Sequence, residues 1–88
     1  MKIEVSKVDD RVCLLISPIT LTIADRLAAA YESREVIAAF GTSVTNITKT
    51  PGSELVSLGL YFNHLDTAVF VTLNHLIKAD KPIPIVFR

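Results

Sequence analysis

The start of the chain carries a hydrophobic pattern with a period of two. Ile3 and Val5 alternate with Lys, Glu and Ser residues, and Asp9-Asp10 follows shortly afterwards. This alternation predicts a half-buried strand that ends in a tight turn. Residues 11–17 are apolar on both faces, which is typical of a central strand, and we expect Ser17-Pro18 to interrupt it. The chain is therefore predicted to open with two strands joined by a tight turn.

Between Pro18 and Gly41 the apolar residues recur at helical spacing. The apolar stripe consists of Ile23, Leu27, Ala30, Tyr31 and Ile37. Thr22, with Asp25 three residues later, resembles a capping box, and Gly41 follows as a candidate C-cap. One helix is therefore predicted to run from residue 22 to residue 40.

The segment from Thr42 to Ser53 is rich in Thr, Ser, Asn, Pro and Gly. Such a composition between two periodic segments predicts a loop. A short edge strand over residues 44–47 is compatible with this loop.

Residues 55–62 fit two different patterns. A strand is predicted by the alternation of small or polar residues with Val56, Leu58, Leu60 and Phe62. Apolar residues also recur at a 3-4 spacing from Leu55 to Leu76, which would fit a helix over residues 51–79, about 43 Å long. That helix is long for so small a domain, and β-branched and aromatic residues favour strands. We therefore prefer the strand, and the helix remains the open alternative.

The last part of the chain predicts a helix followed by a strand. Asp66 is placed as an N-cap, and the helix is expected to run to about Ala79, where Asp80-Lys81-Pro82 ends it. Residues 83–87 predict a final strand, with Pro84 as its weak point. The expected fold class is α/β, with α+β as the alternative. It is one domain over residues 1–88, with a single-layer mixed sheet of about four strands and two helices packed on it, in the order ββαβαβ.

Composition excludes several classes of protein. The chain has 88 residues, half of them apolar, and its nine basic residues balance nine acidic ones. This balance argues against disorder, and it leaves no basic excess for neutralising nucleic-acid phosphates. The single cysteine, Cys13, cannot form an internal disulfide and is expected to be a small buried hydrophobe. Neither a transmembrane segment nor a signal peptide is predicted, so the expected location is cytoplasmic and no membrane insertion is expected.

Charged residues are unevenly distributed along the chain. Between Val36 and Ile77 the formally charged residues are Lys49, Glu54 and Asp66, whereas the first 35 residues carry eleven. A stretch so poor in charge is expected to be buried, either by its own fold or by a partner.

Few residues are candidates for chemistry. His64 and His75 lack the further ligands that a zinc site needs, and we expect His75 to be a partly buried packing residue. Phosphate-binding loops, serine elbows and paired carboxylates are not visible, so we predict neither an enzyme nor a cofactor or metal site. The hydroxyl of Thr67 is expected to be exposed at a helix N-terminus beside Asp66.

The second half of the chain resembles a STAS domain. The resemblance rests on Leu58-Gly59-Leu60, then Asp66-Thr67-Ala68 at a helix start, then Lys81-Pro82-Ile83-Pro84-Ile85-Val86 as the next strand. The passage from residue 12 to residue 27 is similar to the family's strand leading into its first helix. Gly59 stands where the family usually has Asp, and Val69 stands where Gly is common.

The resemblance implies a regulatory, protein-binding function. The family includes anti-sigma factor antagonists, stressosome proteins and small subunits of lipid-transport ABC systems. Thr67 matches the position that a partner kinase phosphorylates in the antagonists. The expected partner is a kinase, a sigma-factor regulator or a transporter subunit, bound through the start of the second helix and its adjoining loop: Tyr61, His64, Asp66, Thr67 and Ala68.

A second hypothesis involves only copies of this chain and no different protein partner. It is a small accessory or structural protein, of phage or plasmid type, that forms a homo-oligomer through its charge-poor middle.

Overall fold

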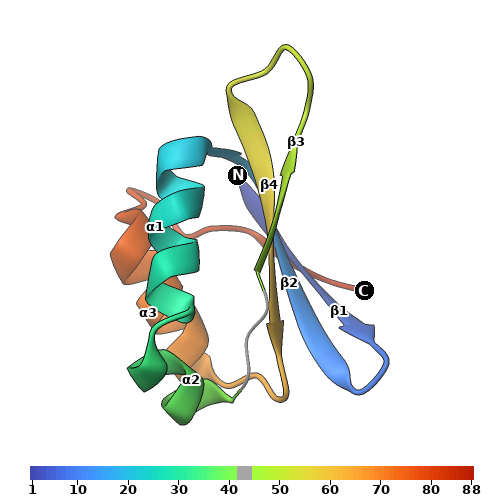
Figure 1. Ribbon diagram of the computed structural model, residues 1–88, viewed down its shortest axis with the longest axis vertical. Coiled ribbons are helices and arrows are strands. Elements are labelled where there is room, and N and C mark those ends of the chain that lie inside the picture. Colours follow the sequence, from blue (N-terminus) through green and yellow to red (C-terminus); the bar gives the residue numbers. More distant parts are fainter. Residues whose placement is uncertain (42–44) are drawn as a thin grey trace.

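The computed structural model describes residues 1–41 and 45–88, and they form two layers. One layer is a sheet, and the other consists of helices that lie on a single face of it (Figure 1). In chain order the elements are β1 (Lys2–Val8), β2 (Arg11–Thr20), α1 (Leu21–Tyr31), α2 (Arg34–Phe40), β3 (Thr45–Lys49), β4 (Leu55–Phe62), α3 (Thr67–Ile77) and β5 (Ile85–Phe87). The mixed α/β class agrees with the expectation. The expected four strands and two helices do not, because the described residues form five strands and three helices.

The sheet has the order β3-β4-β2-β1-β5. β1 and β2 form an antiparallel hairpin in which Val8 is opposite Arg11, and Asp9 adopts a left-handed conformation with φ of 57° in the tight turn. β2 also pairs with β4, which confirms its central position. Only β5, which pairs with β1, runs parallel to its neighbour within the described sheet. The mixed sheet is therefore mostly antiparallel.

Ser17-Pro18 interrupts the regular pairing of the second strand, as predicted, but the strand does not end at Ser17. β2 continues to Thr20, and the pairing with β4 shifts in register between Ile16 and Ile19. A bulge of this kind accommodates a residue without an N–H group, so the strand continues past Pro18.

The predicted helix over residues 22–40 is two helices. α1 begins after Thr20, whose hydroxyl accepts a hydrogen bond from the Ile23 N–H at 3.4 Å, so Thr22 is not the cap. Ser33 caps α2 in the same way, because its hydroxyl accepts from the Val36 N–H at 3.3 Å. Ser33 therefore starts a new helix inside the apolar stripe, because its hydroxyl accepts a hydrogen bond from a backbone N–H that would otherwise bond within one continuous helix.

The predicted elements after residue 41 are all present, but several of them begin or end at other residues than predicted. Residues 55–62 form a strand, and the predicted C-cap Gly41 has a positive φ of 89°. The short edge strand is real but covers Thr45–Lys49, and Val44 lies outside the described residues. α3 ends at Ile77 because Lys78 is left-handed, with φ of 54°. The last strand is shorter than predicted, since regular pairing begins at Ile85, after Pro84.

The core lies between the sheet and α1 and α3. Tyr31 is fully buried there, and its ring meets the edge of Phe62 at a centroid distance of 5.5 Å. Its hydroxyl donates a hydrogen bond to the Val69 carbonyl at 3.1 Å, which joins α1 to α3. Burial raises the pKa of Tyr31 to about 12, so the hydroxyl keeps its proton at physiological pH.

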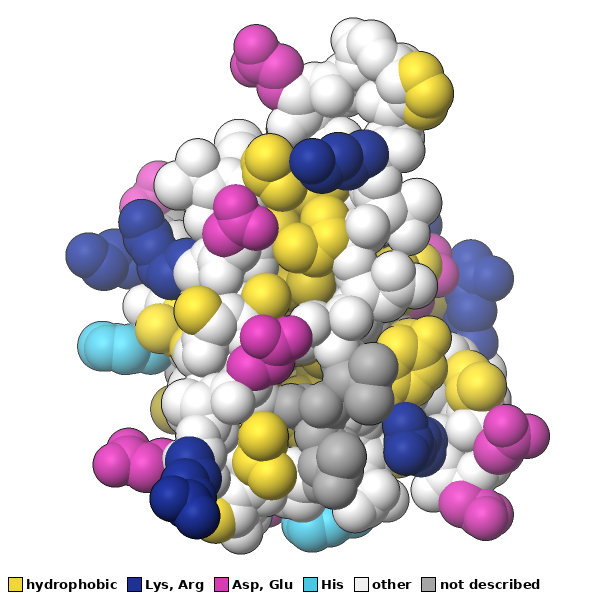
Figure 2. Space-filling view, in the orientation of Figure 1, with side chains coloured by type: hydrophobic (Ala, Val, Ile, Leu, Met, Phe, Trp, Pro, Cys, Tyr) yellow, Lys and Arg dark blue, Asp and Glu magenta, His cyan; other side chains and the backbone are white. Residues whose placement is uncertain are grey.

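Much of the charge-poor stretch is buried within this core. Its buried apolar side chains come from β4 and α3: Val56, Leu58, Leu60, Phe62, Val69 and Leu73. Some hydrophobic side chains still reach the surface between the helices and the β3–β4 hairpin, with charged side chains around them (Figure 2). His75 is exposed rather than packed, because it lies on the face of α3 opposite Val69 and Leu73.

Candidate functional site

Asp66 caps the first turn of α3, as the sequence predicts. Its carboxylate accepts hydrogen bonds from the N–H groups of Ala68, at 2.9 Å, and Val69, at 3.4 Å. The carboxylate therefore satisfies the Ala68 N–H and shares the Val69 N–H with the Asp66 carbonyl, which accepts from it at 3.3 Å. Thr67 follows it at the first helical position and is exposed. A hydroxyl here is accessible from solvent and close to the positive end of the helix dipole.

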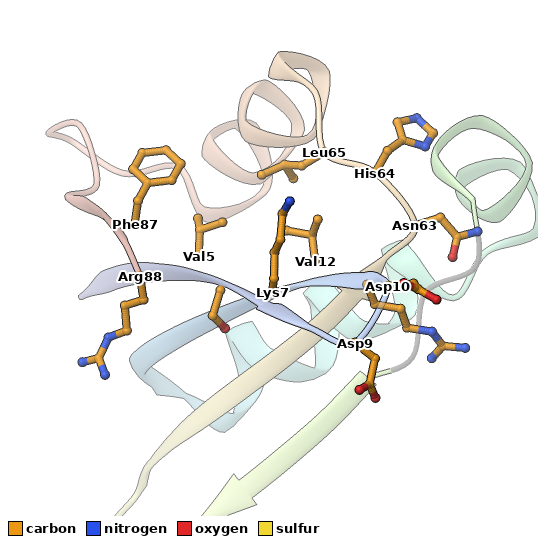
Figure 3. Close-up of a pocket in the computed structure, with 12 residues that line it drawn as sticks. Val5, Lys7, Asp9, Asp10, Val12, Asn63, His64, Leu65, Phe87 and Arg88 are labelled. Carbon is orange, nitrogen blue, oxygen red and sulfur yellow. The ribbon is translucent and has the colours of Figure 1, made fainter.

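The loop that leads into α3 borders a hollow of about 620 Å³. The hollow lies on the helix side of the sheet, between this loop, β5 and the β1–β2 hairpin (Figure 3). We call it the α3 groove. Its lining residues are Val5, Ser6, Lys7, Asp9, Asp10, Arg11, Val12, Asn63, His64, Leu65, Phe87 and Arg88.

Apolar side chains dominate the end of the α3 groove next to β5. Phe87 and Val5 lie at that end, and Val12 and Leu65 extend the apolar lining toward the middle of the groove (Figure 3). Phe87 is opposite Val5 in the β1–β5 pair, so it lies on the face of the sheet that carries the core. Phe87 is nevertheless 73% exposed. An aromatic side chain on the core face of a sheet is normally covered by other side chains. Within the described residues, nothing covers Phe87 to that extent, so this part of the face is open to solvent.

Lys7 supplies positive charge at the same place. Its side chain rises from β1 toward Leu65, whereas Asp9 and Arg88 point away (Figure 3). Among the described residues no salt bridge reaches Lys7. Lys2, on the same strand, instead contacts the Glu4 carboxylate at 3.0 Å on the opposite face, where Arg88 also binds it at 3.1 Å.

These ion pairs on the opposite face affect Glu4. The hydrogen bond from Lys2, together with the positive charges of Lys2 and Arg88, holds the pKa of the Glu4 carboxyl below its usual value. The two lysines of β1 therefore differ: Lys2 has an anionic partner within the chain, and Lys7 has none among the described residues.

The structure brings together only part of the predicted partner-binding set. His64 lines the α3 groove, and Asp66, Thr67 and Ala68 follow directly at its border. Tyr61 lies elsewhere, since it is opposite Cys13 on the face of the sheet without helices. It lines a separate hollow of about 300 Å³ beside the hairpin turn. The negative charge of a neighbouring Cys13 thiolate would oppose ionisation of Tyr61, which raises the pKa of its hydroxyl.

Cys13 itself is buried, as the sequence predicts, with 8% of its surface exposed. Lys7 and Phe87 are the contributors that sequence reasoning missed. The signal for Phe87 was present, since Ile85-Val86-Phe87 is uniformly apolar. The signal for Lys7 was absent, because a charged residue at the end of a strand is ordinary.

Other kinds of site find no support among residues 1–41 and 45–88. They include no cluster of three His, Cys, Asp or Glu side chains that could hold a metal ion. Each helix in this part of the chain falls short of the length and apolar character that a membrane span requires. Comparisons with protein-family models, with curated proteins and with solved structures gave no match.

Proposed function

We propose that this protein is a cytoplasmic, non-enzymatic interaction module that binds a protein partner in the α3 groove. One observation carries the proposal: Phe87, in the apolar part of the groove, is 73% exposed although it lies on the core face of the sheet. Uncovered apolar surface of this kind marks interaction sites, and exposed aromatic side chains are common anchors in interfaces. The groove adjoins the start of α3, which is also the surface that the STAS resemblance favours.

The chemistry of the groove favours a particular kind of partner segment. Val5, Leu65 and Phe87 provide an apolar surface for an aliphatic or aromatic side chain. Lys7 provides an ammonium group without an ion-pair partner among the described residues. We therefore expect the partner to present an apolar side chain next to an Asp or Glu carboxylate.

Thr67 provides a means of regulating this contact. A phosphate on Thr67 would add nearly two negative charges at the positive end of the α3 dipole, where the helix tolerates them. The same charges would repel an acidic partner segment at the border of the groove. Phosphorylation by a kinase would thus weaken binding without unfolding the protein.

A peptide selection tests the groove. Selection of random displayed peptides on the purified protein is expected to enrich an apolar residue beside Asp or Glu. The amide NMR signals of Val12, Leu65 and Phe87 should shift when a selected peptide is added. Lys7→Gln should weaken that peptide by about two- to fivefold, because an exposed ion pair contributes modestly to binding. Lys2→Gln, the matched control on the opposite face, should leave binding unchanged. Equal effects of the two variants, or shifts confined to the opposite face, would contradict the proposed site.

The switch is tested with the same peptide. Thr67→Glu is expected to weaken binding by about two- to fivefold through charge repulsion, with an unchanged circular dichroism spectrum. Thr67→Ala, which adds no charge, should bind like the wild type. If Thr67→Glu binds as tightly as Thr67→Ala, Thr67 is not a switch, whereas the groove itself would still stand.

A further inference from the structure

β5 is an unprotected edge of the sheet. It consists of Ile85, Val86 and Phe87, which are 40%, 40% and 73% exposed. All three side chains are apolar. An exposed edge strand with apolar side chains is a template for pairing with another strand.

The backbone groups of β5 alternate between β1 and solvent. The Pro84 carbonyl accepts from the Ile3 N–H at 2.9 Å, and the Arg88 N–H donates to the Val5 carbonyl at 2.8 Å. Because backbone groups of a strand alternate with a period of two, Val86 also faces β1. The N–H and C=O groups of Ile85 and Phe87 therefore point outward. In the described part of the chain no hydrogen bond reaches these four groups.

The opposite edge of the sheet differs in chemistry. β3 carries polar side chains along most of its length, including Asn46, Thr48 and Lys49. Polar and Lys side chains on an edge strand discourage pairing with other chains. β5 has neither a charged side chain nor an outward-facing proline, since Pro84 precedes the strand and its backbone faces β1.

We propose that β5 pairs antiparallel with β5 of a second copy of this chain, so that two sheets join into one. The arrangement is self-complementary about a two-fold axis through Val86. Ile85 then lies opposite Phe87 of the second copy, and the reverse pair forms by symmetry. These two pairs use all four outward groups of each copy in N–H···O=C bonds, and Val86 faces its own equivalent.

Side chains also match across this junction. Ile85 and Phe87 share the helix face of the sheet, because they are opposite Ile3 and Val5 of β1. An aliphatic side chain would therefore pack against the exposed ring of Phe87, a favourable cross-strand pair. The contact is a short strand edge, in the class of interfaces below roughly 1,200 Å² that associate weakly. We expect a monomer–dimer equilibrium in the micromolar range or weaker.

Sedimentation equilibrium of the full chain tests the pairing. The wild type should fit a monomer–dimer model between micromolar and millimolar concentrations. Ile85→Pro and Ile85→Ala both remove the aliphatic side chain, but only proline also removes the outward N–H. Ile85→Pro should raise the dissociation constant about tenfold or more relative to Ile85→Ala, since two symmetry-related hydrogen bonds are lost. A wild type that stays monomeric, or equal dissociation constants for the two variants, would overturn the proposal.

A second pair of variants covers the case in which Ile85→Pro unfolds. Phe87→Lys and Val71→Lys both place a lysine on an exposed apolar position, since Phe87 is 73% and Val71 is 68% exposed. Neither change disturbs the core. Phe87→Lys should abolish dimerisation over the measured range, and Val71→Lys, on α3, should leave it intact. Equal effects would show that the association is not specific to β5.

Register is tested by cross-linking. Val86→Cys should form an intermolecular disulfide in oxidised glutathione, because directly opposed residues without mutual hydrogen bonds lie about 4.5 Å apart between Cα atoms. Ile85→Cys should cross-link much more slowly, since Ile85 faces Phe87 of the second copy. The wild type, with its buried Cys13, should not cross-link. Faster cross-linking of Ile85→Cys than of Val86→Cys would contradict the proposed pairing.

Discussion

Replacement of Phe62 with alanine is expected to lower the free energy of unfolding by about 3–5 kcal/mol. Phe62 is fully buried on β4, and its ring packs edge-on against Tyr31 of α1. Loss of the ring removes apolar contacts and leaves a cavity between the sheet and α1. A domain of this length has a total stability of about 4–13 kcal/mol, so the change removes a large part of it. Chemical denaturation monitored by circular dichroism measures the loss.

Phe62→Leu is the matched control for this prediction. Leucine keeps an apolar side chain at the same position and leaves a smaller cavity, so the expected loss is roughly 1–2 kcal/mol. If Phe62→Ala were as stable as Phe62→Leu, the ring would not be packed between β4 and α1 in solution, contrary to the contact with Tyr31.

The second large effect distinguishes the two faces of the sheet. Leu14 and Leu15 are neighbours on β2, so their side chains point to opposite faces. Leu14 is fully buried beneath the helices, whereas Leu15 lies on the face without helices and is partly exposed. Leu14→Ala should lower the free energy of unfolding by about 2–5 kcal/mol, and Leu15→Ala by about 1 kcal/mol.

The same substitution at adjacent positions makes each variant the control of the other. Thermal or urea denaturation of both proteins measures the difference at low protein concentration. Equal losses would contradict the prediction, because they would mean that Leu15 is also covered in solution. A larger loss of stability for Leu15→Ala than for Leu14→Ala would mean that the core lies on the face of the sheet opposite the helices.

Local signals predicted the strands well. The alternation that ends at Phe62 specified a strand because every second residue, from Val56 onward, could be buried on one face. The rival helix over residues 51–79 is wrong, since it would have placed these residues around a cylinder with no second apolar surface to cover them. Asp66 was recognised as a cap because its side chain makes contacts within its own segment.

The exact start of each helix and the pairing register at Pro18 were harder to predict, because several residues could serve the same purpose. Thr20, Thr22 and Ser33 all have side chains suited to an N-cap, and the structure uses the first and third. The choice depends on where the chain leaves β2 and where α1 must end to pack against the sheet. The register shift at Pro18 depends equally on the neighbouring strand β4.

The candidate site was predicted only in its contiguous part. His64, Asp66 and Thr67 follow one another in the chain, so a loop and a helix start could place them together. Phe87 joins them because β5 pairs with β1 across the sheet, and Lys7 joins them at the end of β1. Tyr61 is excluded because one residue along a strand reverses the face, and Phe62 takes the core side.

The sequence by itself determined most of the strands, the start of α3 and which side chains of the central strands face the core. It did so because period and capping depend on residues within about one turn or one strand of each other. Only the tertiary structure decided the strand order, with β5 beside β1 rather than beside β4. That choice leaves Phe87 uncovered on the core face and the outer edge of β5 without a partner among the described residues. Pairing between distant segments depends on the whole sheet, and both proposed interactions arise from it.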